Sequence, residues 1–174
     1  MIRPLKYRDL LEFIRIYMDQ PKDSRQQFYP FPRTRAFLVP LSLYLATANL
    51  IPHSVPGFLP RFRFQTIVSV EKQTHDMRGF AYLRWDTSSA AHFGILVDQS
   101  YRGQGIGERL LAEIFDIAEC RGVKTLTLTV EKENYPAISL YKKFGFDIIE
   151  TNSDGAHQMK TSIGRRLPEN EGPT

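Results

Sequence analysis

The chain has 174 residues, of which 42% are hydrophobic and 24% are charged, and its formal net charge is +4 at pH 7. This length favours one domain with a substantial core, and a composition close to the globular average excludes a largely disordered chain. The single cysteine, Cys120, excludes an internal disulfide and a cysteine-based metal cluster, and we expect its thiol to be buried where a helix ends.

The distribution of charge and hydropathy along the chain limits which kinds of partner and which cellular compartment are expected. The Lys and Arg residues are scattered rather than clustered, which argues against nucleic acid as the main partner. Residues 36–60 carry no charge but are interrupted by prolines, which argues against a membrane span. The first residues lack the leader of a secreted protein, so a cytoplasmic protein is expected. The histidines show no metal-ligand spacing, so no metal is expected.

The N-terminal part combines short elements with proline-rich connections. Residues 2–5 are expected to form a strand, and residues 7–18 an amphipathic helix. Its predicted apolar face consists of Leu10, Leu11, Ile14 and Tyr17 or Met18. Residues 34–49 have helical length but contain Pro40, so a helix begins near that proline or is kinked there. The uncharged segment 36–60 is expected to pack on the domain, and a lid over an acceptor site or a homodimer contact are two hypotheses for it.

The rest of the chain predicts strands and helices around a parallel pair. Runs of β-branched and aromatic residues predict strands at 62–70, 78–85, 91–97, 124–130, 146–150 and 157–163. Helices are expected from about Glu108, after the glycine turn, to about Arg121 and from Asn134, which caps the second one, to Gly145. The strand, helix, strand order across 91–130 requires a parallel pair with a right-handed crossover. Residues 1–164 are expected to form one α/β domain and 165–174 a frayed tail.

The turn between the central strand and the next helix contains three alternating glycines, Gly103, Gly105 and Gly107. Glycines let the backbone approach a ligand, and the first amides of a helix lack intrahelical partners, so this turn predicts an anion site. Arg102 at its mouth adds a charge suited to a diphosphate. A nucleotide-hydrolysing loop is excluded because no Lys-Ser or Lys-Thr pair follows. A dinucleotide loop needs a glycine where Glu108 stands, yet it stays open because Glu131 mimics the ribose-binding acid.

A third pattern, Arg/Gln-x-x-Gly-x-Gly/Ala, is matched in full by Arg102-Gly103-Gln104-Gly105-Ile106-Gly107. A second run follows at Asn134 to Phe146, Asn-Tyr-Pro-Ala-Ile-Ser-Leu-Tyr-Lys-Lys-Phe-Gly-Phe. With both runs in this order, the chain resembles the GCN5-related N-acetyltransferases across Phe80 to Ile149, and most of all their branch that acetylates protein N-termini. The resemblance implies a mixed, mostly antiparallel sheet of six to seven strands with a central parallel pair, flanked by about four helices.

The resemblance also implies how acetyl-coenzyme A is held. Backbone groups of Leu96 and Val97 would hold the pantetheine arm in the manner of an added strand, and residues 102–107 would hold the diphosphate. Asn134 would reach the coenzyme arm as well as capping its helix. Tyr141 corresponds to the general acid that protonates the departing thiolate. The competing interpretation of Tyr141 is a core residue of an amphipathic helix.

The general base is left open by the sequence. An acceptor amine must lose a proton before it attacks the thioester. In the resembled branch a glutamate stands twelve residues ahead of the tyrosine, where this chain has Thr129, which cannot do the same work. Glu131 and His92 are the first candidates, and the further candidates are Asp86, Glu71 and water.

These residues predict an N-acetyltransferase that moves acetyl from acetyl-coenzyme A to a primary amine of a small molecule or a peptide by direct attack, without a covalent enzyme intermediate. An alternative, favoured by the missing glutamate, is a sensor that binds acyl-coenzyme A without turnover. A nicotinamide dehydrogenase is a third hypothesis.

Overall fold

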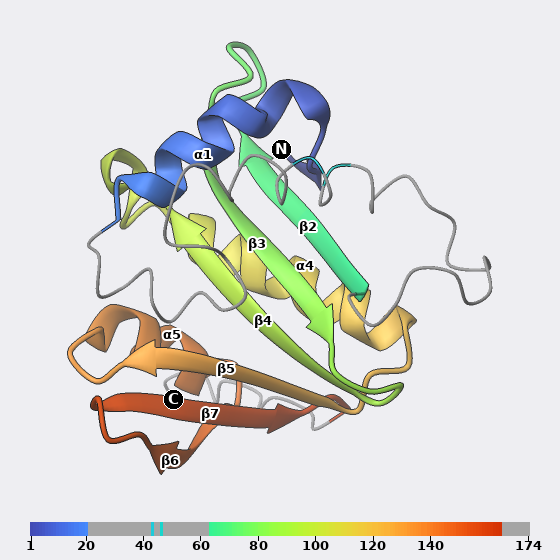
Figure 1. Cartoon of the computed structure of the whole chain (residues 1–174), viewed down its shortest axis with the longest axis vertical. Helices are drawn as coiled ribbons and strands as arrows, with labels where there is room; N and C mark the ends of the chain where they lie inside the picture. The colour runs from blue at the N-terminus through green and yellow to red at the C-terminus, as the bar shows by residue number, and fades with distance from the viewer. Residues whose placement is uncertain (21–42, 44–45, 47–62, 165–174) are drawn as a thin grey trace, which may run out of the picture.

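In the described part of the chain, seven strands form one sheet in the order β1-β2-β3-β4-β5-β7-β6 (Figure 1). The computed structural model describes residues 1–20, 43, 46 and 63–164. The strands are β1 (Ile2–Pro4), β2 (Arg63–Val70), β3 (Met77–Trp85), β4 (Ala90–Val97), β5 (Thr125–Glu131), β6 (Asp147–Thr151) and β7 (Ala156–Ser162). They lie close to the strands expected from the sequence, and the mixed α/β fold is confirmed.

Only one neighbouring pair in this sheet, β4 with β5, is parallel, and the other five pairs are antiparallel. The parallel ladder is short, joining Ala90 to Thr125, Ala91 to Leu126 and His92 to Thr127. In Figure 1 the two strands then diverge toward their carboxyl ends. A mostly antiparallel sheet is not the parallel doubly wound sheet that binds dinucleotides, which disfavours the dehydrogenase hypothesis.

Two helices cover one face of the sheet, α4 (Ile106–Cys120) and α5 (Tyr135–Lys143). The buried side of α4 follows helical spacing through Ile106, Leu110, Leu111, Ile114 and Ala118. These side chains pack on inward-facing residues of β3, β4 and β5. Cys120 lies on the other side of α4 and is exposed, so the expected buried thiol is wrong, because the last turn of α4 directs this position away from the core.

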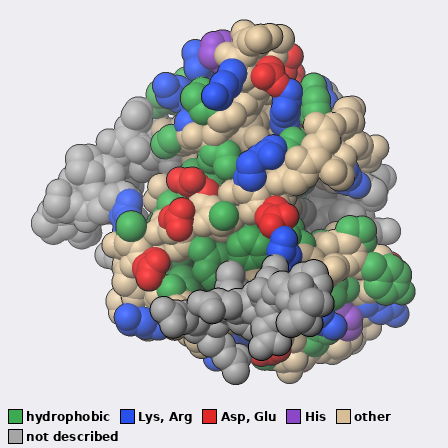
Figure 2. Space-filling model, turned by 180° about the vertical axis from the view of Figure 1, so that it is seen from behind, with side chains coloured by type: hydrophobic (Ala, Val, Ile, Leu, Met, Phe, Trp, Pro, Cys, Tyr) green, Lys and Arg blue, Asp and Glu red, His purple; other side chains and the backbone are tan. Residues whose placement is uncertain are grey.

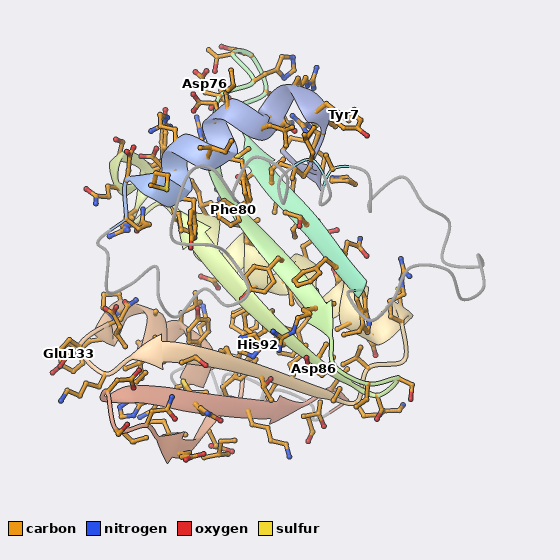
Figure 3. All side chains as sticks on the ribbon, in the orientation of Figure 1. Tyr7, Asp76, Phe80, Asp86, His92 and Glu133 are labelled. Atoms are coloured by element: carbon orange, nitrogen blue, oxygen red, sulfur yellow. The ribbon has the colours of Figure 1, made fainter. Side chains whose placement is uncertain are left out.

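The opposite face is covered at one end by a 3₁₀ turn (η1, Tyr7–Asp9) and α1 (Leu10–Met18). The buried residues of α1 are Phe13, Ile16 and Tyr17, and Leu11 is 82% exposed. The predicted apolar face, which included Leu11, was therefore rotated from the observed one. Phe13 decides the rotation, because its ring lies 4.4 Å from that of Phe80 on β3, beneath α1 (Figure 3).

The face of the molecule that lies behind the sheet carries both charged and hydrophobic side chains (Figure 2). Viewed from behind the sheet, acidic and basic side chains are interspersed around hydrophobic ones, so this face carries charge of both signs (Figure 2).

The described part of the chain contains three α-helices. The predictions for segment 34–49, for the uncharged segment 36–60 and for the tail at 165–174 fall largely or wholly outside the described residues. Among the helices that are described, none has the length and apolar character needed to cross a membrane.

Candidate functional site

The end of the β4–β5 ladder leaves one edge of β4 without a strand partner among the described residues. Pairing on that side stops at His92, whereas pairing with β3 continues to Val97. The backbone of residues 93–97 therefore has hydrogen-bonding groups directed toward the diverging strand β5. The expected arm-binding residues Leu96 and Val97 belong to this open edge, which suits a ligand that adds main-chain-like hydrogen bonds.

The glycine loop (Arg102–Gly107) follows β4 after a short 3₁₀ turn (η2, Gln99–Tyr101). Gly103 and Gly105 have φ angles of +75° and +70°, a region that side chains with a Cβ adopt at a cost. Gly105 is the N-cap of α4, and no side chain caps this helix. The first amides of α4 therefore have no side-chain acceptor and are directed at the loop, where they favour an anion.

Other residues near this helix terminus adjust its charge. Glu108 lies in the first turn of α4, but its carboxylate is 2.6 Å from Lys143 Nζ on α5. This ion pair offsets the negative charge of Glu108 beside the expected anion site. Asn134 caps α5, with its Oδ1 accepting from the Ala137 amide at 3.3 Å, as expected. Since β4 and β5 are parallel, the glycine loop and Asn134 follow their carboxyl ends and lie at the same edge of the sheet.

Arg102 is held by two neutral oxygen atoms. Its Nη2 donates to Gln20 Oε1 at 2.8 Å, and its Nε donates to the Val97 carbonyl at 3.3 Å. No carboxylate of the described residues lies within ion-pair distance of this guanidinium. The arginine expected to contact a diphosphate therefore keeps an unpaired positive charge beside the glycine loop.

A hollow of about 330 Å³ opens where the carboxyl end of α1 meets the turn after β4. Its lining consists of Arg15, Ile16, Asp19, Gln20, Asp98, Gln99 and Ser100. Gln20 also contacts Arg102, so this hollow adjoins the glycine loop on the side of the sheet that α1 covers. The sequence contained no signal for it, because its two halves lie about 80 residues apart.

Tyr141 is both a core residue and a neighbour of the open edge. Its ring meets Phe93, the first β4 residue beyond the parallel ladder, edge-on at a centroid distance of 6.0 Å. It also contacts Phe146 at 5.9 Å. Burial raises the pKa of the Tyr141 phenol, which keeps the hydroxyl protonated at neutral pH. A protonated phenol is the state that a general acid needs, so the two interpretations of Tyr141 are compatible.

His92 stands at the last paired position of the parallel ladder. Its Nδ1 lies 3.2 Å from Thr127 Oγ1, and the same hydroxyl donates to the Ala91 carbonyl at 3.4 Å. Burial, together with the nearby Arg84 guanidinium, lowers the pKa of His92 to about 4. The imidazole is therefore neutral at neutral pH. Figure 3 shows His92 and Asp86 toward the end of the strands opposite α1.

Glu131 ends β5 on the same face as Thr127 and Thr129, as the strand alternation predicted. Its Oε1 is shielded from solvent and has no hydrogen-bond partner among the residues that the structure describes. Four residues of strand separate it from Thr127, which is about 13 Å. The structure therefore does not bring Glu131 and His92 together, and the two candidate bases occupy different parts of the diverging strands.

The two remaining candidate bases, Glu71 and Asp86, each form an ion pair. Glu71 pairs with Arg78, and Asp86 lies 2.8 Å from Arg84 Nη2. Each of these two carboxylates is therefore already engaged in a charge-assisted contact within the protein. Gln20 and Thr127 were not predicted from the sequence as neighbours of the candidate residues. Thr127 was detectable from the strand alternation, whereas Gln20 had no signal because it is distant in sequence from Arg102.

Comparison with known proteins gives one family. A family model described as the acetyltransferase (GNAT) family matches residues 52–146 of this chain. The [ribosomal protein bS18]-alanine N-acetyltransferase of Escherichia coli K12 is 41% identical over 75 residues, which are 43% of this chain and 51% of that protein. The chain thus matches about half the length of such curated relatives.

Two solved structures share the fold over nearly the whole chain. The ribosomal-protein-S18-alanine N-acetyltransferase of E. coli has a TM-score of 0.59 and 26% identity, covering 96% of this chain and 97% of that one. A putative acetyltransferase of Salmonella typhimurium, solved with its cofactor acetyl-CoA, has a TM-score of 0.70 and 17% identity, covering 100% and 97%. The second similarity concerns the fold alone.

Proposed function

The chain belongs to the acetyltransferase (GNAT) family, and on this basis we propose that it transfers an acetyl group from acetyl-coenzyme A to a primary amine. The observation that carries the proposal is the open edge of β4 beyond His92, which leads directly into the glycine loop. The edge suits the amide-bearing arm of the coenzyme, and the loop suits its diphosphate. We also propose residues 1–164 as one catalytic domain, since β1 and β7 belong to the same sheet.

The residues present fit this coenzyme. Backbone groups of Leu96 and Val97 would bind the arm, and the amides of residues 103–107 would bind the diphosphate together with Arg102. Asn134, at the same edge of the sheet, would approach the arm from the side of β5. Bound in this way, the coenzyme supplies a thioester, and the open edge orients its carbonyl through main-chain hydrogen bonds.

The proposed reaction is direct. The amine nitrogen attacks the thioester carbon, a carbon–nitrogen bond forms, and the carbon–sulfur bond breaks. Tyr141 supplies a proton or a hydrogen bond to the departing thiolate, and the amine proton passes to a base. His92 and Glu131 are the proposed proton acceptors, acting directly or through water. His92 is neutral at neutral pH, and Glu131 has an unpartnered oxygen atom.

A primary amine of a peptide or a small molecule is the proposed acceptor. One curated relative, 41% identical over 75 residues, acts on the alanine of a ribosomal protein, according to its name. This chain has Thr129 where the resembled branch has a glutamate, so its acceptor need not be the same. Peptides beginning with alanine, free amino acids and polyamines are therefore the acceptors to compare first.

Two measurements test the proposal. Calorimetric titration with acetyl-coenzyme A, coenzyme A and NAD is expected to show micromolar binding of the first two and none of NAD. Release of the coenzyme thiol is then followed with each acceptor class, with mass spectrometry of the product to locate the acetyl group. Selective binding without transfer to any amine would contradict the enzyme and favour a sensor, and a preference for NAD would contradict the coenzyme site.

A further inference from the structure

The carboxyl end of α1 is joined to the turn after β4 by two side-chain contacts of different character. Arg15 Nη2 lies 2.9 Å from Asp98 Oδ2, and Arg102 Nη2 donates to Gln20 Oε1 at 2.8 Å. Asp98 in turn accepts from the Ser100 amide at 2.9 Å. Arg15 of α1 and Gln20, two residues beyond its end, therefore hold both the start of this turn and the arginine that opens the glycine loop.

The side chain of Gln20 is itself held in one orientation. It is 7% exposed, and its Nε2 donates to the Ile16 carbonyl one turn earlier, at 3.2 Å. The amide carbonyl must then be directed at Arg102. Since Val97 O accepts from Arg102 Nε, two fixed acceptors define the plane of the guanidinium and leave its other donors available.

The neutrality of these acceptors distinguishes Arg102 from Arg15. Arg15 contacts three carboxylates, those of Glu12, Asp19 and Asp98, so its charge is used within the protein. Gln20 orients Arg102 without neutralising it. An oriented guanidinium loses less conformational freedom when it binds an anion, and it keeps the full charge for that anion.

We propose that Gln20 is a positioning residue for coenzyme binding, which holds the Arg102 guanidinium in place for the coenzyme diphosphate. This inference rests on the proposed function. Gln20 acts through Arg102 and does not itself touch the ligand. Its effect therefore requires both Arg102 and a ligand that carries a diphosphate.

The test is a double-mutant cycle on coenzyme A affinity, measured by calorimetry. Gln20→Ala is expected to raise the coenzyme A Kd about 3- to 10-fold, the effect of releasing one oriented side chain. Arg102→Ala is expected to raise it about 10- to 100-fold through loss of charge-assisted hydrogen bonds. In the Arg102→Ala background, Gln20→Ala should have no further effect.

Two additional variants separate positioning from general damage to the fold. Gln20→Glu keeps the shape of the side chain but places a carboxylate against Arg102, and it should weaken coenzyme A binding more than Gln20→Ala does. Gln65→Ala is the matched control, because Gln65 Oε1 accepts from Arg121 Nη2 at 3.4 Å at the other end of α4. This control should leave the Kd unchanged.

An acetyl donor without the diphosphate provides a further comparison. S-acetylpantetheine lacks the diphosphate, so its kcat/KM in acetyl transfer should be the same for the unaltered protein and Gln20→Ala. Equal losses from Gln20→Ala with and without Arg102, or an equal loss with S-acetylpantetheine, would overturn the inference and leave the proposed function standing. Failure of the unaltered protein to bind coenzyme A would overturn both.

Discussion

His92 and Thr127 meet side chain to side chain at the last rung of the parallel ladder, with 3.2 Å between His92 Nδ1 and Thr127 Oγ1. The Thr127 hydroxyl can donate its hydrogen to the Ala91 carbonyl, 3.4 Å away. In that arrangement it accepts from Nδ1–H of the neutral imidazole, and Nε2 then holds the lone pair that can accept a proton from a substrate.

Stability should depend on pH through His92. Its pKa in the folded protein is about 4, below the usual value of 6.5 for an unfolded chain, so the unfolded state binds more protons between these values. The free energy of unfolding should therefore fall as pH decreases from about 6.5 to 4, by roughly 3 kcal/mol at most. Urea unfolding at pH 7 and pH 4.5 measures this change. His92→Gln should show a smaller fall, and an identical fall in both proteins would contradict the prediction.

Tyr141→Phe should reduce turnover without weakening coenzyme binding. The change removes a general acid, which is worth about 100-fold or more in kcat, but it leaves the ring contacts with Phe93 and Phe146. Acetyl transfer and calorimetry on the same preparation measure the two effects. Tyr135→Phe is the control, since Tyr135 is on the same helix but 72% exposed. Unchanged kcat in Tyr141→Phe would assign this residue to the core alone.

Gly105 allows a comparison that separates backbone strain from charge. Its φ of +70° disfavours any side chain, while a Cβ built there has only Arg109 Nη1 within 4 Å, at 3.8 Å. Gly105→Gln and Gly105→Glu should therefore lose similar stability, about 1 kcal/mol. Only Gly105→Glu adds a negative charge beside the diphosphate. Its coenzyme A Kd should exceed that of Gly105→Gln by at least about tenfold, and equal values would show that no anion binds at this helix terminus.

Gly79 and Gly107 should respond in opposite ways to alanine. A Cβ at Gly79 would lie 2.7 Å from the Leu96 backbone oxygen, which cannot move without disturbing β4, so we expect a loss of about 1–3 kcal/mol. At Gly107 the nearest atom is Leu140 Cδ2 at 3.5 Å, an ordinary contact. Gly107→Ala should be neutral or more stable by about 0.5–1 kcal/mol because alanine favours helix. Urea unfolding measures the change in the free energy of unfolding of each variant. Comparable losses of stability in the two variants would refute the steric argument.

Several parts of the candidate site were predictable because they depend on neighbouring residues. Left-handed backbone at Gly103 and Gly105, the Asn134 cap and the alternation along β5 each follow from a few consecutive residues. The two sequence runs that carry the family resemblance are of this local kind. They were sufficient to predict the fold and the family, both of which are confirmed.

The orientation of elements relative to one another was decided only by the tertiary structure. The apolar face of α1 was predicted with Leu11 inside, because several rotations of this helix bury aliphatic residues. The contact between Phe13 and Phe80 selects one of them. Cys120 is exposed for a similar reason, since the packing of α4 determines which side of its last turn faces the sheet.

The sequence by itself therefore determined which residue types surround the glycine loop and which strand and helix hold it. Only the tertiary structure decided that the parallel ladder ends at His92 and that Gln20 holds Arg102. Strand register and helix rotation are set by the packing of the whole core, and contacts between residues some 80 positions apart arise from them. No local pattern of residues contains that information.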